Sequence, residues 1–131
     1  MDATVRRALE RGLTCDITTT GRRSGRPRRI EIWYFLVEGR VYLTGTPGPR
    51  DWLANLRLNP RLIFHVKEGA AADLPARALI VDDPGERRRV MAAVMAANSW
   101  FRAQRFGLEA WVAGSPLVEV VFEGEPPTGQ P

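Results

Sequence analysis

Residues 15–37, with the sequence CDITTTGRRSGRPRRIEIWYFLV, predict a β-hairpin. Residues 15–20 are rich in β-branched side chains, which favour a strand. Residues 21–27 predict the turn, because their glycines tolerate a positive φ and their proline fixes its own φ. Residues 28–37 then predict the second strand. An antiparallel sheet is therefore expected to begin with this hairpin.

The antiparallel pattern continues after the hairpin. A tight turn at residues 38–40 leads to a third strand at residues 41–46, so the first three strands form a meander. Three later segments also have strand character: residues 62–67, 76–81 and 117–122. Helices are expected at residues 2–13, at residues 50–58 and after the start signal at residues 83–86.

The fold class expected from this order is mainly β (α+β), a six-stranded antiparallel barrel with short helices. A parallel βαβ arrangement is disfavoured because the helices do not alternate with the strands. A length of 131 residues suits one domain. We therefore expect a single domain at residues 1–124 and a polar tail at residues 125–131.

Composition excludes several classes of protein. Hydrophobic residues make up 44% of the chain and charged residues 26%, which is typical of a globular protein. No apolar run reaches the roughly 18–20 residues that a membrane-spanning helix needs. The N-terminus lacks the layout of a signal peptide, so a cytoplasmic location is expected. A single cysteine, Cys15, and a single histidine, His65, argue against disulfides, a metal site and a Ser/His/Asp triad.

Basic residues are concentrated in the turn of the hairpin. Arginine accounts for 18 of the 19 basic side chains. Five arginines lie close together here: Arg22, Arg23, Arg26, Arg28 and Arg29. A guanidinium group is planar and permanently charged, so it suits phosphate and carboxylate ligands. The alternative is a solvated turn that binds no ligand.

Two motifs resemble those of a known family. One is TTTGRRSGRPR at residues 18–28, and the other is PRDWLANLRLNP at residues 49–60. Together they are similar to the deazaflavin (F420)-dependent nitroreductase and oxidoreductase family. Members of that family are split β-barrels of the FMN-binding-like superfamily, related to pyridoxamine-phosphate-oxidase-like proteins. The resemblance covers residues 15–66.

The resemblance implies a deazaflavin-dependent oxidoreductase of the nitroreductase family. The coenzyme would be F420, an 8-hydroxy-5-deazaflavin, and its reduced form would give a hydride to a small, electron-poor substrate. The positions that match the family's coenzyme site are Arg22, Arg23, Ser24, Arg28, Arg29, Ile30, Trp33, Thr44, Gly45, Thr46, Pro47, Asp51, Trp52, Leu53 and Asn55. No catalytic side chain is implied, because the coenzyme carries the redox chemistry.

The residue types at these positions suit such a coenzyme. The arginines could pair with its phosphodiester and its glutamate carboxylates, and the free backbone N–H groups at the helix start near Arg50 would attract a phosphate oxygen. Thr44 and Thr46 lie two residues apart on a predicted strand, so their hydroxyls should share one face. Trp33 and Trp52 offer flat apolar surfaces to an aromatic ring, although the helical position of Trp52 also favours the core.

The sequence leaves the substrate and two other functions open. Nitroreducing members have tyrosines in the C-terminal part, whereas the tyrosines here are Tyr34 and Tyr42. One alternative is a split barrel that binds FMN or haem, because the arginines would hold the FMN phosphate equally well. Another is a nucleic-acid-binding module, because the pI is about 10.2. The lack of a recognition-helix pattern argues against the latter.

Assembly can also be predicted from the late part of the chain. Its expected helix has more large apolar side chains than one helix face can bury, namely Val90, Met91, Val94, Met95 and Trp100. Related split barrels pair as homodimers. We therefore expect a homodimer that uses this helix as its interface.

Overall fold

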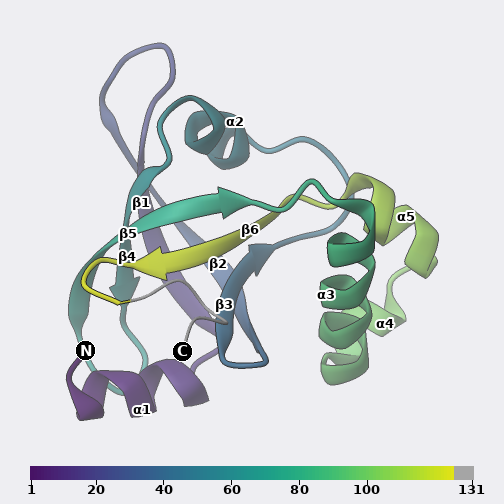
Figure 1. The fold of residues 1–131 in the computed structure, drawn as a ribbon, viewed down its shortest axis with the longest axis horizontal. Helices are drawn as coiled ribbons and strands as arrows, with labels where there is room; N and C mark the ends of the chain where they lie inside the picture. Colours follow the sequence, from purple (N-terminus) through teal and green to yellow (C-terminus); the bar gives the residue numbers. More distant parts are fainter. Residues whose placement is uncertain (126–131) are drawn as a thin grey trace.

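The structure is a computed structural model that describes residues 1–125. Six strands form one closed antiparallel barrel in the order β1-β2-β3-β6-β5-β4 (Figure 1). The strands are β1 (Thr14–Thr20), β2 (Pro27–Val37), β3 (Arg40–Thr44), β4 (Arg61–Val66), β5 (Ala72–Ile80) and β6 (Leu117–Phe122). The helices are α1 (Ala3–Arg11), α2 (Asp51–Leu58), α3 (Pro84–Ala97), α4 (Ser99–Ala103) and α5 (Leu108–Gly114). The expected antiparallel barrel is confirmed, and the expected tail lies, apart from Glu125, outside the described residues.

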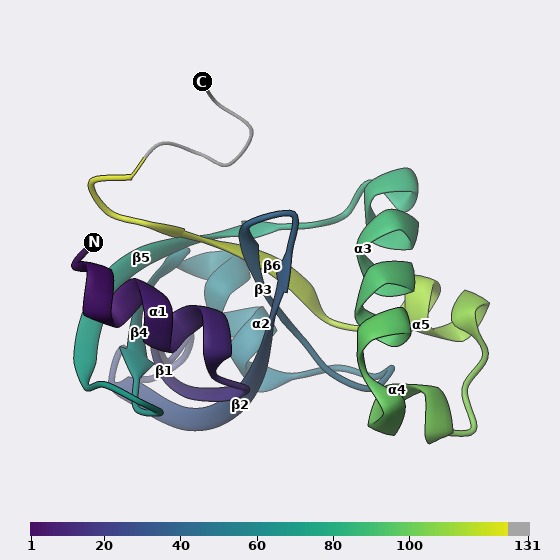
Figure 2. The ribbon, with the colours of Figure 1, turned by 90° about the horizontal axis from the view of Figure 1, so that it is seen from below.

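The helices occupy three separate places around the barrel. Helix α1 lies at one end, and α2 lies at the other end, beside the projecting turn between β1 and β2 (Figure 1). Helices α3, α4 and α5 form a layer on one side of the barrel, which is clearest when the molecule is turned (Figure 2). None of the helices within residues 1–125 is long and apolar enough to cross a membrane.

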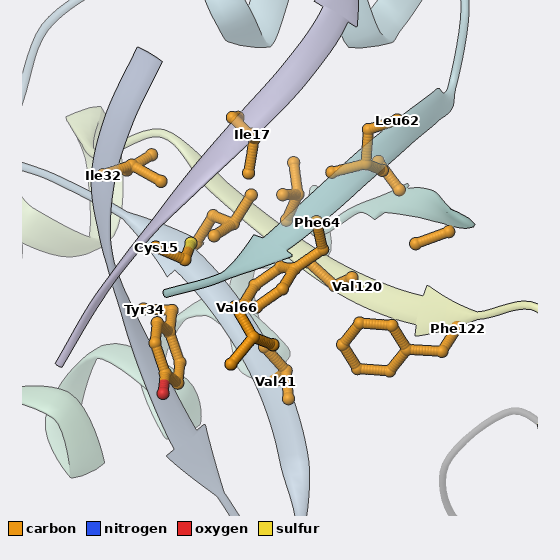
Figure 3. Packing of buried hydrophobic residues seen from close by; sticks show 14 of the residues in the cluster. Cys15, Ile17, Ile32, Tyr34, Val41, Leu62, Phe64, Val66, Val120 and Phe122 are labelled. Atoms are coloured by element: carbon orange, nitrogen blue, oxygen red, sulfur yellow. The ribbon is translucent and has the colours of Figure 1, made fainter. Parts of the chain in front are cut away.

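Alternate side chains of the strands fill the inside of the barrel. Cys15 and Ile17 of β1 are fully buried, and Ile17 is paired with Phe64 of β4. The rings of Phe64 and Phe122 meet edge to face with their centroids 5.4 Å apart (Figure 3). These contacts join the first, fourth and last strands in one apolar core.

Polar contacts fix the helix starts. The Asp2 carboxylate accepts hydrogen bonds from the backbone N–H groups of Thr4 and Val5, so α1 begins directly after it. The carboxylate of Asp83 caps α3 in the same way, by accepting from the N–H of Glu86. Both helices therefore begin close to the residues that the sequence indicates.

A second apolar cluster lies between the barrel and the α3–α5 layer. Tyr42 of β3 and Trp111 of α5 are fully buried there, and Phe101 of α4 stacks on Trp111 with 4.8 Å between the ring centroids. The sequence predicts one late helix that continues through Phe101, whereas α3 ends at Ala97 and α4 is a separate short helix; α5 has no counterpart in the prediction. Helices α4 and α5 cover side chains that the sequence left without a partner.

The α3–α5 layer buries most of the apolar side chains from which the homodimer interface is predicted. Val90, Met91 and Val94 are at most 1% exposed within a single chain. The expectation that they require a second subunit to be buried is therefore wrong, because α4, α5 and the barrel already cover them. Trp100 stays 50% exposed. The homodimer itself remains a prediction.

Two strands have an end that differs by more than one residue from the predicted bounds. Strand β3 ends at Thr44, two residues early, because Gly45 and the residues after it turn toward α2. Strand β5 begins at Ala72, four residues early, and contains Pro75. Asp73 and Pro75 are poor strand formers, and both side chains face solvent on the outside of the barrel.

Candidate functional site

The β1–β2 turn is held in one shape by its own backbone. The N–H of Gly21 donates to the carbonyl of Arg26, and the N–H of Gly25 donates to the carbonyl of Gly21, both at 2.8 Å. Gly25 has a φ of +71°, which favours glycine. A Cβ atom at Gly21 would lie 2.8 Å from the hydroxyl of Ser24, so a larger residue would displace that side chain. The turn therefore presents its arginines from a defined scaffold.

A buried amide connects this turn to α2. The side-chain oxygen of Asn55 accepts from the backbone N–H and from Nη1 of Arg22, each at 3.1 Å. Its amide nitrogen donates to the hydroxyl of Thr19 at 3.2 Å. Arg22 also reaches Asp51 at 3.2 Å, but the Asp51 carboxylate is 91% exposed, so this ion pair contributes little stability.

A cleft of about 550 Å³ opens between the turn and α2, and we call it the hairpin cleft. Its lining consists of Thr19, Gly21, Arg22, Arg23, Ser24, Arg28, Ile30, Asp51, Trp52 and Asn55. The side chains of Arg23 and Arg28 have no hydrogen bond or ion pair with any residue between 1 and 125, whereas the Arg22 side chain is bonded to Asn55. Two guanidinium groups are thus free to bind an anion in this cleft.

A second cleft, of about 630 Å³, adjoins the first, and we call it the aromatic cleft. It is lined by Ile30, Glu31, Ile32, Trp33, Thr44, Gly45, Thr46, Arg50, Trp52, Trp100 and Phe101. Ile30 and Trp52 line both clefts. The two clefts therefore form a continuous surface that is cationic at one end and apolar at the other.

Two half-exposed tryptophans stand at the aromatic end. Trp33 is 39% exposed and Trp100 is 50% exposed, and their ring centroids are 6.2 Å apart. Trp100 belongs to α4, whose start is capped by Asn98. Large exposed aromatic rings beside a cleft offer apolar surface to a flat ligand. Trp52, in contrast, is 8% exposed and belongs mainly to the barrel core, as its helical position suggests.

The loop between β3 and α2 is held by Arg50. Its Nη2 donates to the carbonyl and to the hydroxyl of Thr46, both at 2.9 Å. Its Nη1 donates to the carbonyls of Gly48 and Pro49. One side chain thus fixes a loop that has no regular secondary structure. Its role is not apparent from the sequence, because it depends on the guanidinium folding back over its own loop.

Twelve of the fifteen positions expected from the sequence line one of the two clefts. The three others lie elsewhere: Arg29, Pro47 and Leu53. Arg29 pairs with Asp16 at 3.0 Å on the outside of the barrel, and Pro47 packs against Gly114 of α5. Leu53 lines a different cavity on the other side of α2.

The two threonines of the β3–α2 segment do not present their hydroxyls together. Because β3 ends at Thr44, the two-residue alternation of a strand does not extend to Thr46. The Thr44 side chain is buried, and its hydroxyl donates to the carbonyl of Pro116 at 2.6 Å. The Thr46 hydroxyl accepts from Arg50 and keeps its own proton available for a ligand.

Cys15 and His65, the cysteine and the histidine of the chain, line neither cleft. Burial raises the pKa of the Cys15 thiol to about 12, so this thiol stays protonated in the barrel core. His65 is 7% exposed; its Nδ1 lies 2.6 Å from a carboxylate oxygen of Asp73 and its Nε2 lies 2.7 Å from the hydroxyl of Thr18. The bond from His65 lowers the pKa of Asp73. Residues 1–125 contain no group of three His, Cys, Asp or Glu side chains that could hold a metal ion.

Comparison with known proteins places this architecture in a family. Residues 1–108 match the family model described as F420H2-dependent quinone reductase. Among solved structures, the chain resembles a conserved hypothetical protein from Mycobacterium tuberculosis, with 18% identity, a TM-score of 0.73 and coverage of 100% of this chain and 92% of that one.

Two further solved structures resemble the chain over most of its length. A FAD-binding protein from Mesorhizobium loti has 16% identity and a TM-score of 0.67, with coverage of 94% and 91%. A protein of the pyridoxinephosphate oxidase family from Clostridium acetobutylicum has 13% identity and a TM-score of 0.65, with coverage of 90% and 80%. At these identities the likeness shows a shared fold, the split barrel, and does not identify a ligand of this chain.

Proposed function

Because the chain belongs to the F420H2-dependent quinone reductase family and is an F420-dependent oxidoreductase, we propose that it transfers a hydride from the reduced deazaflavin to a small, electron-poor acceptor. A quinone, the acceptor in the family description, belongs to this chemical class. The observation that carries the proposal is the continuity of the two clefts, which share Ile30 and Trp52. The hairpin cleft, with its arginines, suits an anionic chain, and the aromatic cleft suits a flat ring.

The hairpin cleft fits the anionic part of the coenzyme. A phosphodiester and a glutamate tail need positive partners, and Arg23 and Arg28 line the cleft with guanidinium groups that are not bonded to any of the described residues. Arg22 is less available, because Asn55 and Asp51 already accept from it. We therefore assign the anion-binding role to Arg23 and Arg28, with Arg22 as a support for the turn.

The aromatic cleft fits the deazaflavin ring and the acceptor. Ile30, Trp33 and Trp52 provide apolar surface, and the Thr46 hydroxyl provides a donor for a ring heteroatom. The bound coenzyme supplies the hydride, so the protein needs no nucleophile. The protein's contribution is to hold ring and acceptor face to face and to exclude water from the space between them.

Binding of the coenzyme tests this proposal directly. A fluorescence titration with reduced or oxidised F420 should saturate in the wild-type protein. Arg23→Ala and Arg28→Ala should each raise the dissociation constant about tenfold, since each removes a charge-assisted hydrogen bond, while slowing hydride transfer at saturation much less. Arg26→Ala is the matched control, because Arg26 belongs to the same turn but does not line the cleft. A lack of saturable binding at tens of micromolar coenzyme would refute the proposal.

FMN is the second candidate ligand. Arg23 and Arg28 would bind the FMN phosphate as well as a phosphodiester, and a structural relative is described as FAD-binding. The absorbance of the freshly purified protein separates the two candidates, because FMN that stays bound has a flavin band in the visible range. A nucleic-acid role is disfavoured, because the two free arginines lie inside a cleft; a gel-shift assay at physiological salt tests it.

A further inference from the structure

A cavity of about 700 Å³ lies on the far side of α2 from the two clefts, and we call it the α2–α5 cavity. It shares no lining residue with either cleft. Trp52 and Asn55 of α2 face the clefts, whereas Leu53 and Arg57 line the cavity. Its apolar walls come from α2, β5, α5 and β6: Leu53, Ile80, Val112 and Leu117. Of its lining residues, the resemblance to a known family assigns a role only to Leu53.

Arg87 provides a half-buried positive charge on the wall of this cavity. Its Nε donates to the carbonyl of Val112 at 2.7 Å and its Nη1 to the carbonyl of Val81 at 2.9 Å. Its Nη2 donates to the carbonyl of Ser115. Burial is the largest influence on this group and lowers its pKa. Within residues 1–125 no carboxylate lies within ion-pair distance of Arg87; Asp82, which is already paired with Arg57, attracts it only from a longer distance.

The other charges around the cavity are already paired. Arg57 donates to the Asp82 carboxylate through its two terminal guanidinium nitrogens, Nη2 at 3.0 Å and Nη1 at 3.3 Å. Glu109 binds Arg88 through both carboxylate oxygens. Within each of these two pairs the opposite charges cancel, so the net charge around the cavity is the positive charge of Arg87. An anion is therefore the ligand whose charge complements this wall.

Ser115 supplies a second unused polar group. The residue is 4% exposed and lines the cavity, and its hydroxyl has no hydrogen-bond partner among the described residues. A buried hydroxyl without a partner costs stability. Its oxygen is closed off from the cavity in this rotamer, so a ligand that accepts its proton would recover that cost after the side chain rotates toward the cavity. The carbonyl of the same residue accepts from Arg87, which places both polar groups in one region of the wall.

We propose that the α2–α5 cavity binds a small organic carboxylate with an apolar body. The carboxylate lies against Arg87 and accepts from the Ser115 hydroxyl, while the apolar body covers Leu53 and Val112. Two of the five guanidinium N–H groups of Arg87 remain after its three carbonyl bonds, which is the number that a bidentate carboxylate needs. This site is separate from the coenzyme clefts, and its failure would leave the proposed function intact.

Three ligands with one apolar body test the charge requirement: hexanoate, hexanol and hexylamine. Backbone amide chemical shifts of the full chain report where and how tightly each binds. Hexanoate should shift the amides of Gly48 and of residues 112–115, and hexanol should bind about tenfold more weakly because it lacks the charge-assisted bonds. Hexylamine should bind more weakly still. Equal affinity for hexanoate and hexanol would overturn the proposal, as would shifts confined to residues 22–28.

A matched pair of variants separates ligand binding from structural damage. Ala113 is exposed and lines the cavity, so a side chain added there should not disturb the fold. Ala113→Asp places a carboxylate near Arg87 and should weaken hexanoate about tenfold, while Ala113→Asn should change affinity less than about twofold. Ser115→Ala should weaken hexanoate and leave the thermal midpoint unchanged or higher. Unchanged hexanoate affinity in Ala113→Asp would show that Arg87 only links α3 to α5.

Discussion

One oxygen atom of Asn55 accepts two hydrogen bonds from the same residue, Arg22: one from its backbone N–H and one from its guanidinium, each at 3.1 Å. Because Asn55 is 5% exposed and lies on α2, this pair of bonds fixes the arginine-rich turn against a helix. The width of the hairpin cleft thus depends on an amide that is almost fully buried.

Removing that amide should open the hairpin cleft. Asn55→Ala leaves the Arg22 N–H and the Thr19 hydroxyl without their partners, so we expect a loss of about 1–3 kcal/mol in unfolding free energy and weaker coenzyme binding. Denaturant unfolding and fluorescence titration measure the two effects. Thr19→Val is the control: it removes the acceptor of the Asn55 amide nitrogen and leaves both bonds from Arg22 to the Asn55 oxygen in place. Equal loss of coenzyme binding in both variants would contradict the role of the oxygen.

Arg50 should be necessary for a preformed aromatic cleft. Arg50→Met removes four hydrogen bonds to the β3–α2 loop, so coenzyme affinity should fall about tenfold with a smaller change in the rate at saturation. Arg50→Lys should restore binding only in part, because an ammonium has three donors and no planar fork. The titration and the saturating rate, measured together, distinguish loop positioning from a direct role in chemistry.

Trp100 should affect the acceptor more than the coenzyme. It is half exposed beside Trp33 at the outer end of the aromatic cleft. Trp100→Ala should raise the KM for a quinone acceptor roughly three- to tenfold by removing one aromatic contact, with little change in coenzyme affinity. Leu58→Ala is a control for loss of exposed apolar surface, since Leu58 is 70% exposed and lines neither cleft. An unchanged KM would exclude Trp100 from the acceptor site.

Acid should weaken the attachment of the N-terminal segment through Glu68. Its carboxylate accepts from the N–H groups of Thr14 and Leu13, at 2.6 and 2.9 Å, and these bonds lower its pKa. A lowered folded-state pKa means that the stability from Glu68 is present above its unfolded pKa and is lost as the pH falls through the folded value. Thermal midpoints from about pH 7 down to about pH 3 should fall more steeply in wild type than in Glu68→Gln. Parallel curves for the two proteins would contradict this assignment.

Val94→Arg should unfold the chain rather than divide a dimer. Val94 is 1% exposed between the barrel and the α3–α5 layer, so the substitution buries an unpaired charge and should cost on the order of 3–5 kcal/mol. Circular dichroism and solubility report the loss of fold. Light scattering of the wild type tests the predicted homodimer separately, because one chain has a mass of 14.7 kDa. A soluble, folded Val94→Arg monomer would restore α3 as the interface.

The sequence predicts the strands of the hairpin well and the late helices poorly, for physical reasons. Residues 15–37 combine β-branched segments with a turn rich in glycine, and these are local signals. Helices α4 and α5 are short and are stabilised by Phe101 and Trp111 packing on a distant part of the barrel, which no local pattern reveals. Likewise the predicted strand begins at residue 76, after Pro75, whereas β5 already pairs with β4 from Ala72 onward. The Pro75 ring is accommodated because it faces solvent on the outside of the barrel.

The candidate site could be predicted to the level of segments but not of every side chain. Arg28 and Arg29 are neighbours on β2, and successive side chains of a strand point to opposite faces, so only one of them could line the cleft. Arg28 does, and Arg29 pairs with Asp16 outside. Consecutive residues of a helix also point in different directions, so the position of Leu53 directly after Trp52 could have shown that the two side chains do not line the same cleft. The position of Arg50 over its own loop has no counterpart in any sequence pattern.

The place of β6 between β3 and β5 has a consequence for synthesis of the chain. Residues 117–120 pair with residues 41–44, so the sheet can close only after residue 120 has left the ribosome. Until then the edges of β3 and β5 have unpaired backbone groups, which favour pairing with other nascent chains. A chain released at residue 108, where the family match ends, would keep both edges open. Pairing of β6 thus decides between a closed barrel and aggregation.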